Sequence, residues 1–251
     1  MSGGIDFGRR LMELAERAEK TCAYTYTDFC NMQELSVYAG MKRELNFVAN
    51  EDFGGAEECE RRMIRFGDRE LCGYEEPFPI SLLEIKPVQE KFADALSHRD
   101  FLGSLLGLGL QREKTGDILV KDNRAYAFVH RDIADYIADN LEYVKHTHVK
   151  VSVCEAVPEE VKPRREKQRL IVSSNRLDAV IARLYRLSRE QAAKLISQAC
   201  VYINGAECVS TSKTIKEGDV VSVRGHGKFV FTGEAGQSKK ERLYVDVEVY
   251  I

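Results

Sequence analysis

The clearest pattern of hydrophobic and polar positions lies in the C-terminal third of the chain, where apolar residues recur with helical spacing. The first stripe follows i, i+3, i+4 and i+7 and consists of Leu177, Val180, Ile181 and Leu184. The second stripe consists of Ala192, Leu195, Ile196 and Ala199. Ser188 and Gln191 have the spacing of a capping box, so the second helix is expected to begin at Ser188. The pattern predicts two short helices that share one core.

Strand patterns follow these two helices. Residues 201–203 and 206–209 flank Asn204-Gly205, a dipeptide that favours the tight turn of a β-hairpin. A second turn at residues 216–219 leads into another strand. We therefore expect a small α+β unit at the C-terminus.

The middle of the chain follows the order strand, helix, strand, strand, helix, strand. The six segments are residues 80–85, 97–108, 117–120, 125–129, 132–141 and 144–153. This order is the plan of the ferredoxin-like fold, and Ser97 with Asp100 predicts the cap of its first helix. Tyr126 and Phe128 share one sheet face in this plan. Stacked aromatics can bind RNA on such a sheet, but two aromatics on one face more often belong to a core, and we expect a core role here.

The first part of the chain predicts a third, smaller α+β unit. Two helices are expected within residues 5–42, a further helix over 56–62 and a strand over 63–66. Two pairs of prolines then divide the chain, because each pair interrupts regular structure. The expectation is a multidomain α+β protein with an N-terminal domain over 1–75, a ferredoxin-like domain over 76–157, a basic linker over 158–173 and a C-terminal domain over 174–251.

Charge is distributed unevenly along the chain. The formal net charge is −3, with 37 Lys+Arg against 40 Asp+Glu. Residues 158–251 hold 17 basic and 12 acidic residues, a net of +5, whereas residues 1–157 carry −8. Residues 162–189 hold nine basic and two acidic residues, which is an electrostatic footprint for phosphate. On charge alone, a solvated linker followed by an arginine-rich helix explains this run equally well.

Composition argues against several other classes of protein. No run of about 18 apolar residues predicts a transmembrane helix, and residues 1–10 lack a signal-peptide pattern. The seven cysteines form no C-x-x-C pair, which is typical of reduced thiols in a cytoplasmic protein. His146 and His148 share a strand face without a third ligand nearby, so we expect no metal site.

Two short constellations contain catalytic residue types without catalytic geometry. Ser97, His98 and Asp100 are neighbours on one helical turn and cannot form a nucleophile–base–orienter line. The glycine motif at residues 107–109 closes a helix, whereas a dinucleotide-binding loop opens one. Neither motif therefore predicts an active site or a cofactor.

Four motifs of the C-terminal unit resemble the S-four RNA-binding domain (alpha-L type) in order and spacing. They are Arg176-Leu177-Asp178, Ser188-Arg189, Val201-x-Ile203-Asn204-Gly205 and Gly218-Asp219-Val220-x-Ser222-Val223-Arg224. Residues 222–229, with segments 96–103 and 116–120 of the middle domain, further resemble the YlmH-like RNA-binding proteins of bacteria. The resemblance implies a small N-terminal domain, an RRM-like middle domain of ferredoxin fold and a C-terminal S-four domain.

The resemblance also implies which residues contact RNA. They are Arg176, Arg183, Ser188, Arg189, Gln191, Lys194, Asn204, Lys213, Arg224 and Lys228. Helical spacing places Arg176 and Arg183 seven residues apart on one face of the first helix. Glu207 and Cys208 depart from the pattern, because such modules often carry a basic residue after this turn.

The function implied by the resemblance is non-enzymatic RNA binding. YlmH-like proteins are tied to ribosomal and transfer RNA, and related small proteins with this module bind large ribosomal subunits that hold peptidyl-tRNA. We therefore expect a cytoplasmic protein that binds rRNA or tRNA at the large subunit in translation quality control, without a cofactor. A further hypothesis is that the acidic N-terminal portion docks onto a protein partner. The alternative is an RNA-modifying enzyme that uses the S-four module as an anchor, although no catalytic motif supports it.

Overall fold

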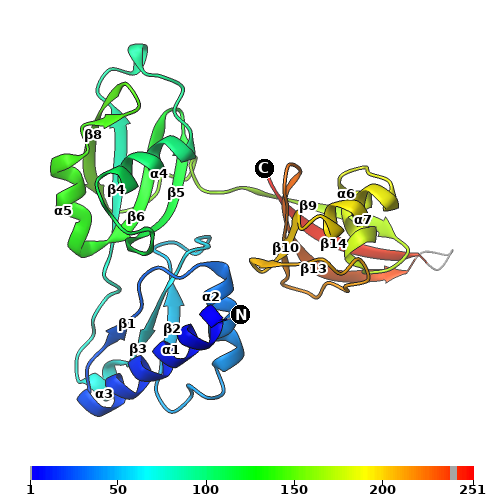
Figure 1. Ribbon diagram of the computed structural model, residues 1–251, viewed down its shortest axis with the longest axis horizontal. Coiled ribbons are helices and arrows are strands. Elements are labelled where there is room, and N and C mark those ends of the chain that lie inside the picture. Colours follow the sequence, from blue (N-terminus) through cyan, green and yellow to red (C-terminus); the bar gives the residue numbers. More distant parts are fainter. Residues whose placement is uncertain (1, 238–241) are drawn as a thin grey trace. The chain divides into compact units, whose positions relative to one another are not determined.

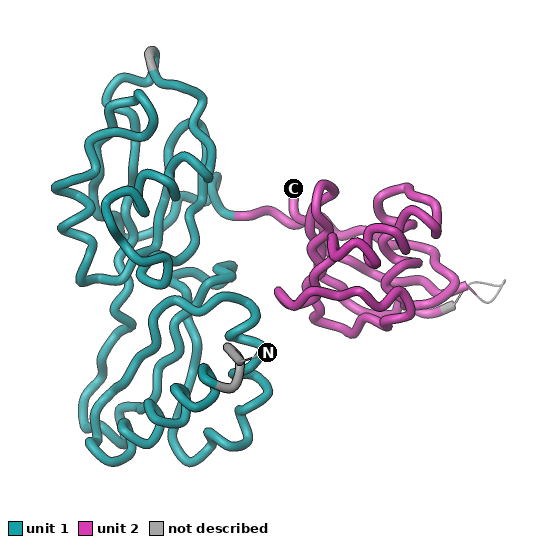
Figure 2. The backbone as a smooth tube through the Cα atoms, viewed as in Figure 1, with its two compact units in different colours: residues 1–162 teal, residues 163–251 magenta. Residues whose placement is uncertain are grey.

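The computed structural model describes residues 2–237 and 242–251 of the chain (Figure 1). These residues form two compact units, 1–162 and 163–251 (Figure 2). The described strands form a three-stranded and a five-stranded sheet in the first unit and a six-stranded sheet in the second. None of the described helices combines the length and the apolar character that crossing a bilayer requires. The protein is of the mixed α+β class, as the sequence predicts.

The unit 1–162 begins with a helix packed on a small antiparallel sheet. Its first elements are α1 (Ser2–Thr21), β1 (Thr25–Tyr26), α2 (Met32–Met41), β2 (Asn50–Phe53), β3 (Met63–Phe66) and α3 (Arg69–Cys72). The sheet has the order β1-β3-β2. Helix α1 places Leu11, Ala15 and Ala18, all fully buried, in one core with Ile64 and Phe66 of β3. This amphipathic packing fixes the helix on the sheet.

The rest of this unit has the ferredoxin-like plan that the sequence predicts. Its elements are β4 (Ile80–Pro87), η1 (Glu90–Phe92), α4 (His98–Gly107), η2 (Arg112–Lys114), β5 (Thr115–Lys121), β6 (Arg124–His130), α5 (Arg131–Asn140), β7 (Tyr143–Val144) and β8 (Thr147–Cys154). The antiparallel sheet order β5-β6-β4-β8-β7 places β6 and β4 side by side at the centre. The amide and hydroxyl of Ser97 donate to Asp100 at 2.8 and 2.6 Å, which confirms the predicted start of α4.

Other elements of the unit cover both faces of this sheet at strand β6, which carries Tyr126 and Phe128. On one face, the alanines and Val129 of β6 share a core with α4 and α5. On the other face, Tyr126 and Phe128 are 6% and 3% exposed and share a core with Phe29, Met63 and others from the N-terminal elements. The expected core role of the two aromatic residues is therefore confirmed. Neither ring is free to stack on RNA in this structure.

Residues 56–62, predicted as a helix, instead form turns against β5, so this prediction is wrong. The amides of Glu60 and Arg61 donate to the carboxylate of Asp117, at 2.6 and 3.2 Å. The Arg61 guanidinium also donates to the carbonyls of Phe29 and Thr115, at 2.7 and 3.0 Å. Burial raises the pKa of Asp117 above its ordinary value. These long-range bonds replace the local bonds of a helix.

The unit 163–251 packs two helices on one side of a six-stranded antiparallel sheet. Its elements are β9 (Arg165–Val172), α6 (Leu177–Leu184), α7 (Arg189–Ser197), β10 (Val201–Ile203), β11 (Ala206–Glu207), β12 (Val220–Val223), β13 (Gly227–Gln237) and β14 (Leu243–Tyr250). The sheet order is β11-β10-β12-β13-β14-β9. The predicted helix stripes supply the core, in which Leu177, Val180, Ile181 and Ile196 are fully buried.

The segment expected as a basic linker, 158–173, is largely a strand. Residues 165–172 form β9, which pairs with β14 along its whole length. Leu170 and Val172 turn into the core, while the alternate residues are exposed. The sequence predicts only a short strand over residues 170–172, because the core-facing side of β9 is apolar only in this second half.

The contact between Gly55 and Phe128 gives a test of how the N-terminal elements cover the sheet. Gly55 has φ +101°, and a Cβ placed there would lie 2.2 Å from Cδ1 of Phe128. We expect Gly55→Ala to lower the free energy of unfolding by about 3 kcal/mol, because it adds left-handed strain and a clash within the core. Calorimetric unfolding of the full chain measures this change.

Gly109→Ala is the matched control for this substitution. Gly109 has φ +81°, but no atom lies within 4 Å of the added Cβ. Only the left-handed strain applies there, which costs about 1–2 kcal/mol. Equal losses in the two variants would contradict the close packing of Gly55 on Phe128.

Candidate nucleic-acid interface

Asp178 is the buried charge that joins the two helices of the second unit. It lies in the first turn of α6 with 5% of its surface exposed. Its carboxylate accepts two bonds of 3.1 Å from Arg176 and one of 2.6 Å from Arg189. Arg189 is the first residue of α7, so the carboxylate connects both helix starts. A buried carboxylate needs such partners, because it has lost its water.

Arg176 is the N-cap residue of α6 and has an extended backbone, so the helical spacing that predicts a shared face with Arg183 does not reach it. Besides Asp178, the Arg176 guanidinium contacts the carbonyl of Thr211 at 3.5 Å. Arg183 lies in the last turn of α6 and lines a pocket to which Arg176 does not contribute. The structure therefore separates the two predicted RNA contacts.

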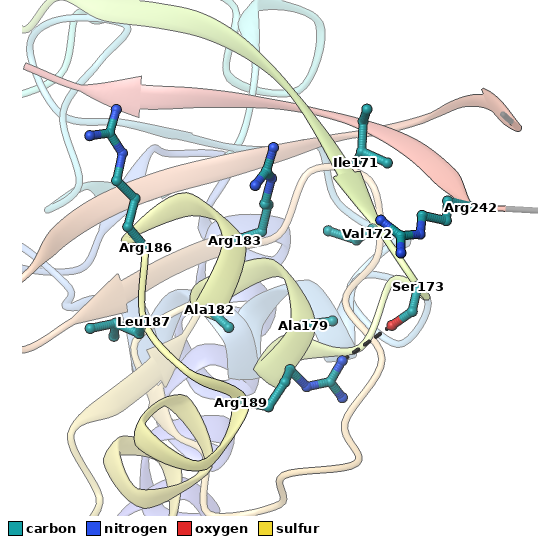
Figure 3. A pocket seen from close by; sticks show the side chains of 10 residues that line it. All are labelled: Ile171, Val172, Ser173, Ala179, Ala182, Arg183, Arg186, Leu187, Arg189 and Arg242. Carbon is teal, nitrogen blue, oxygen red and sulfur yellow. Dashed lines mark hydrogen bonds between the residues drawn. The ribbon is translucent and has the colours of Figure 1, made fainter. Parts of the chain in front are cut away.

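A pocket of about 510 Å³ lies beside α6 and the end of β9 (Figure 3). We call it the arginine pocket, because four of its lining residues are Arg183, Arg186, Arg189 and Arg242. The rest of its lining is mostly apolar and consists of Ile171, Val172, Ser173, Ala179, Ala182 and Leu187. Arg189 donates to the Ser173 hydroxyl at 3.2 Å, which holds this guanidinium at the pocket wall (Figure 3).

Arg183 and Arg186 are the cations of the arginine pocket that remain available to a ligand. Both side chains are exposed, and neither makes an ion pair with any residue in 2–237 or 242–251. The two guanidinium groups extend from the end of α6 in a similar direction (Figure 3). Arginine presents a planar fork of donors that matches phosphate oxygens, so this pair can bind a phosphate backbone.

Most of the basic run on β9 is neutralised across the sheet. Arg165 and Lys167 lie 3.4 and 3.8 Å from Glu248, and Arg169 lies 2.7 Å from Asp246. Arg169 donates to Asp246 and holds the pKa of that carboxyl below its ordinary value. The charge count of this run therefore overstates what it offers to RNA.

Several other predicted contact residues hold the fold together. The amide of Gln191 donates to the Ser188 hydroxyl at 3.0 Å, and the Ser188 amide donates to the Gln191 side chain at 2.8 Å. This is the predicted capping box of α7.

Lys194 and Lys213 have exposed side chains, and the Lys213 carbonyl accepts the Leu177 amide at 2.8 Å. Both lysine side chains can reach a ligand.

Asn204 stabilises the turn between β10 and β11. Asn204 and Gly205 have φ of +49° and +75°, the left-handed conformation that the tight turn requires. The Asn204 side chain donates to Asp219 at 2.9 Å and accepts the Val220 amide at 2.9 Å. Its amide is therefore already engaged within the protein.

Arg224 and Lys228 lie at the opposite end of the sheet from the arginine pocket. The Arg224 guanidinium donates to the Tyr202 hydroxyl at 2.8 Å, and Lys228 lies over the ring of Tyr250 at 4.5 Å. Tyr250 pairs with Arg165, the first residue of β9, whereas the pocket is lined by the last residues of β9. The predicted contact residues thus divide between two surfaces.

Comparison with known proteins bears on the nature of these surfaces. Residues 74–157 match the family model described as "Putative RNA-binding domain in YlmH", and residues 175–221 match the model of the S4 (S-four) domain. A curated relative, "Ribosome-associated protein quality control protein P2" of Bacillus subtilis (strain 168), is 28% identical over 229 residues, covering 88% of this chain and 86% of the relative. The chain therefore carries a middle domain that matches the YlmH model and a C-terminal S-four domain, and it is similar to a ribosome-associated protein over most of its length.

A solved structure shares the fold over part of the chain. "Cell division protein ylmH from Streptococcus pneumoniae" superposes with a TM-score of 0.50 and is 23% identical. The match covers 62% of this chain and 93% of that chain. At this identity the likeness extends to the fold alone.

Sequence reasoning missed two arginines of the S-four domain. Arg186 lies three residues after Arg183, just past the end of α6, and its φ of +56° is left-handed. Its position in the basic run was a usable signal, because a residue at i+3 lies close to the same helix face. Arg242 lies far along the chain at the start of β14, and no local pattern connects it with α6.

The buried carboxylate of the S-four domain gives a second testable prediction. We expect Asp178→Asn to lower the free energy of unfolding by about 2 kcal/mol, because charged hydrogen bonds to two arginines are lost. Hydrogen exchange of amides in residues 177–197, measured by mass spectrometry, should become faster. The control is Glu190→Gln, an exposed acid beside Arg189 in the first turn of α7, which should change stability by less than about 0.5 kcal/mol. Matching exchange profiles for the two variants would argue against a central role for Asp178.

Proposed function

We propose that this protein binds ribosomal or transfer RNA through the arginine pocket of its S-four domain. It acts at large ribosomal subunits that hold peptidyl-tRNA, in ribosome-associated quality control in the cytoplasm. The observation that carries the proposal is the pair Arg183 and Arg186, two exposed guanidinium groups that no described acid neutralises. The name of the curated relative supports the ribosomal setting.

The chemistry of the pocket favours recognition of the RNA backbone. Guanidinium groups bind phosphate oxygens in pairs, and such contacts position a protein without reading sequence. The apolar floor supplied by Ala179, Ala182 and Leu187 gives the sugar a surface free of competing acids. The preferred target is therefore a structured RNA whose shape brings its phosphates to the pocket.

The acidic first 157 residues, with a net charge of −8, form the second part of the proposal. This portion would repel RNA at long range, so we infer that it docks onto a protein of the same assembly. Tyr126 and Phe128 of its ferredoxin-like sheet are buried, which supports a role other than base stacking. A pull-down with residues 1–162 tests this role, and recovery of no protein partner would count against it.

Charge reversal in the arginine pocket tests the RNA-binding role. We expect Arg183→Glu with Arg186→Glu to weaken binding to large ribosomal subunits about 100-fold, because two charged contacts of about 1.5 kcal/mol each are lost. The magnitude of the slope of log K against log salt should fall by about 2. Co-sedimentation with large subunits at several salt concentrations measures both quantities.

The control for this variant is Arg43→Glu with Arg69→Glu. Both residues are exposed in the first unit, and the pair changes the net charge by the same amount. Arg176 and Arg189 are unsuitable targets, because their loss would leave Asp178 buried without its partners. Equal binding of the pocket variant and the control variant would refute the assignment of the pocket.

Binding without chemistry is the expected activity. We expect RNA incubated with the protein to contain no new modified nucleoside, because no motif of the sequence supplies a catalytic group. Mass spectrometry of the digested RNA measures this, with untreated RNA as the control. A new modification would instead support the alternative of an RNA-modifying enzyme anchored by its S-four domain.

A further inference from the structure

Tyrosines and cations alternate in a line across the S-four sheet. Tyr202 of β10 pairs with Ser222 of β12, and Ser222 pairs with Lys228 of β13. Lys228 lies over Tyr250 of β14, which in turn pairs with Arg165 of β9. Residues directly opposite in neighbouring strands share a face. The line therefore runs across five strands on one side of the sheet.

This side is the outer face of the sheet, away from α6 and α7. The intervening residues Val221, Phe229 and Val247 are fully buried in the core beneath the helices. Because side chains alternate along a strand, Ser222, Lys228 and their partners point the other way. Tyr202, Lys228 and Tyr250 are half-buried, and Arg224 and Arg165 are exposed. The outer face thus offers both rings and positive charge.

Each tyrosine is contacted by at least one cation. Arg224 lies 5.8 Å from the ring centre of Tyr202 and donates to its hydroxyl. Tyr250 has Lys228 at 4.5 Å and Arg165 at 5.0 Å from its ring centre. We call these five residues the cation–tyrosine ladder. Such contacts stabilise a sheet on their own, but they also orient the rings and hold the cations beside them.

The ladder is a different surface from the arginine pocket. The arginine pocket lies beside α6, whereas the ladder lies on the outer face of the sheet, and about 26 Å of extended strand separates Arg165 of the ladder from Ser173 of the pocket. Glu207 of β11 pairs with Tyr202 in the sheet, and Glu248 of β14 forms ion pairs with Arg165 and Lys167. Two cations of the ladder are thus held beside its rings, Arg224 at Tyr202 and Lys228 at Tyr250, while Arg165 is shared between Tyr250 and Glu248.

We propose that the cation–tyrosine ladder binds single-stranded RNA, with its rings stacking on unpaired bases and its cations meeting phosphates. Single-stranded RNA binds to proteins through bases that stack on aromatic rings and phosphates that contact cations. A sheet that carries rings with cations between them offers both, and every base has a face that can stack. Bases in a duplex are already stacked and cannot use the rings. Three strand spacings separate the tyrosines by roughly 14 Å, which spans a few nucleotides. The inference deepens the proposed function, because it rests on the S-four domain as the RNA-binding part of the chain.

The experiment uses the full chain and a fluorescein-labelled oligouridylate of about ten nucleotides, a length suited to a single-strand site. We expect Tyr202→Val and Tyr250→Val each to weaken binding at least about fivefold in fluorescence anisotropy, because a stacking ring is lost. Tyr202→Phe and Tyr250→Phe keep the ring and should bind within about twofold of the unaltered protein. A purely structural role predicts no such difference in binding.

Tyr244→Val is the matched control, because Tyr244 lies on the same face of β14 beside Ile171. It is about 20 Å from Tyr250 along the strand and should leave oligouridylate binding unchanged. Where a valine variant fails to fold, Arg224→Gln and Lys228→Gln replace it, each reducing the salt slope by about 1. Unchanged binding in the ladder variants, or no oligouridylate binding by the unaltered protein, overturns the proposal.

Two assays separate this inference from the proposed function. The variant R183E/R186E should no longer bind large subunits but should still bind the oligouridylate. The ladder variants should no longer bind the oligouridylate. Retained subunit binding in R183E/R186E overturns the proposed role of the pocket alone. Retained oligouridylate binding in the ladder variants overturns the ladder alone.

Discussion

Asp178 is the one buried carboxylate among the described residues of the S-four domain, and it links the two helices. It has lost its water and takes its hydrogen bonds from Arg176 and Arg189, one at the start of each helix. The angle between the helices therefore depends on two arginines that resemblance alone would assign to RNA. Because Arg176 and Arg189 are bound to Asp178, the positive charge that a ligand can reach lies with Arg183 and Arg186.

A second constraint acts in the first unit, where the ferredoxin-like sheet has no free aromatic face. Phe128 packs against Gly55, where a side chain would clash, and a Cβ added at Gly116 of β5 would lie 2.6 Å from Cε1 of Phe29. These contacts need glycine at both positions and bring the N-terminal elements onto the sheet. Tyr126 and Phe128 therefore cannot stack on RNA in this arrangement. Aromatic rings that are accessible to RNA must be sought in the second unit.

The sequence predicts those features of the fold that local periodicity encodes. The order of strands and helices between residues 80 and 153, and the two stripes of α6 and α7, follow from spacing alone. Local spacing predicts only residues 170–172 of the strand over 165–172, because its partner β14 lies more than 70 residues away and only Leu170 and Val172 turn inward. The helix predicted over 56–62 is wrong for the same reason. Its backbone amides donate to Asp117, a residue distant in the sequence, and this partner leaves no local pattern. Arg242 enters the pocket through the β14 pairing that local spacing cannot reveal.

The acidic residues of the S-four domain explain how a chain of net charge −3 can still present a basic surface. Asp178, Asp246 and Glu248 are held by arginines or lysines, and Asp219 is held by Asn204 and the Lys216 amide. An acid that is already hydrogen-bonded repels phosphate less, because its charge is offset by its neighbour. The cations without such partners then dominate the local field. Position within the fold, rather than the count of charges, decides which surface an RNA meets.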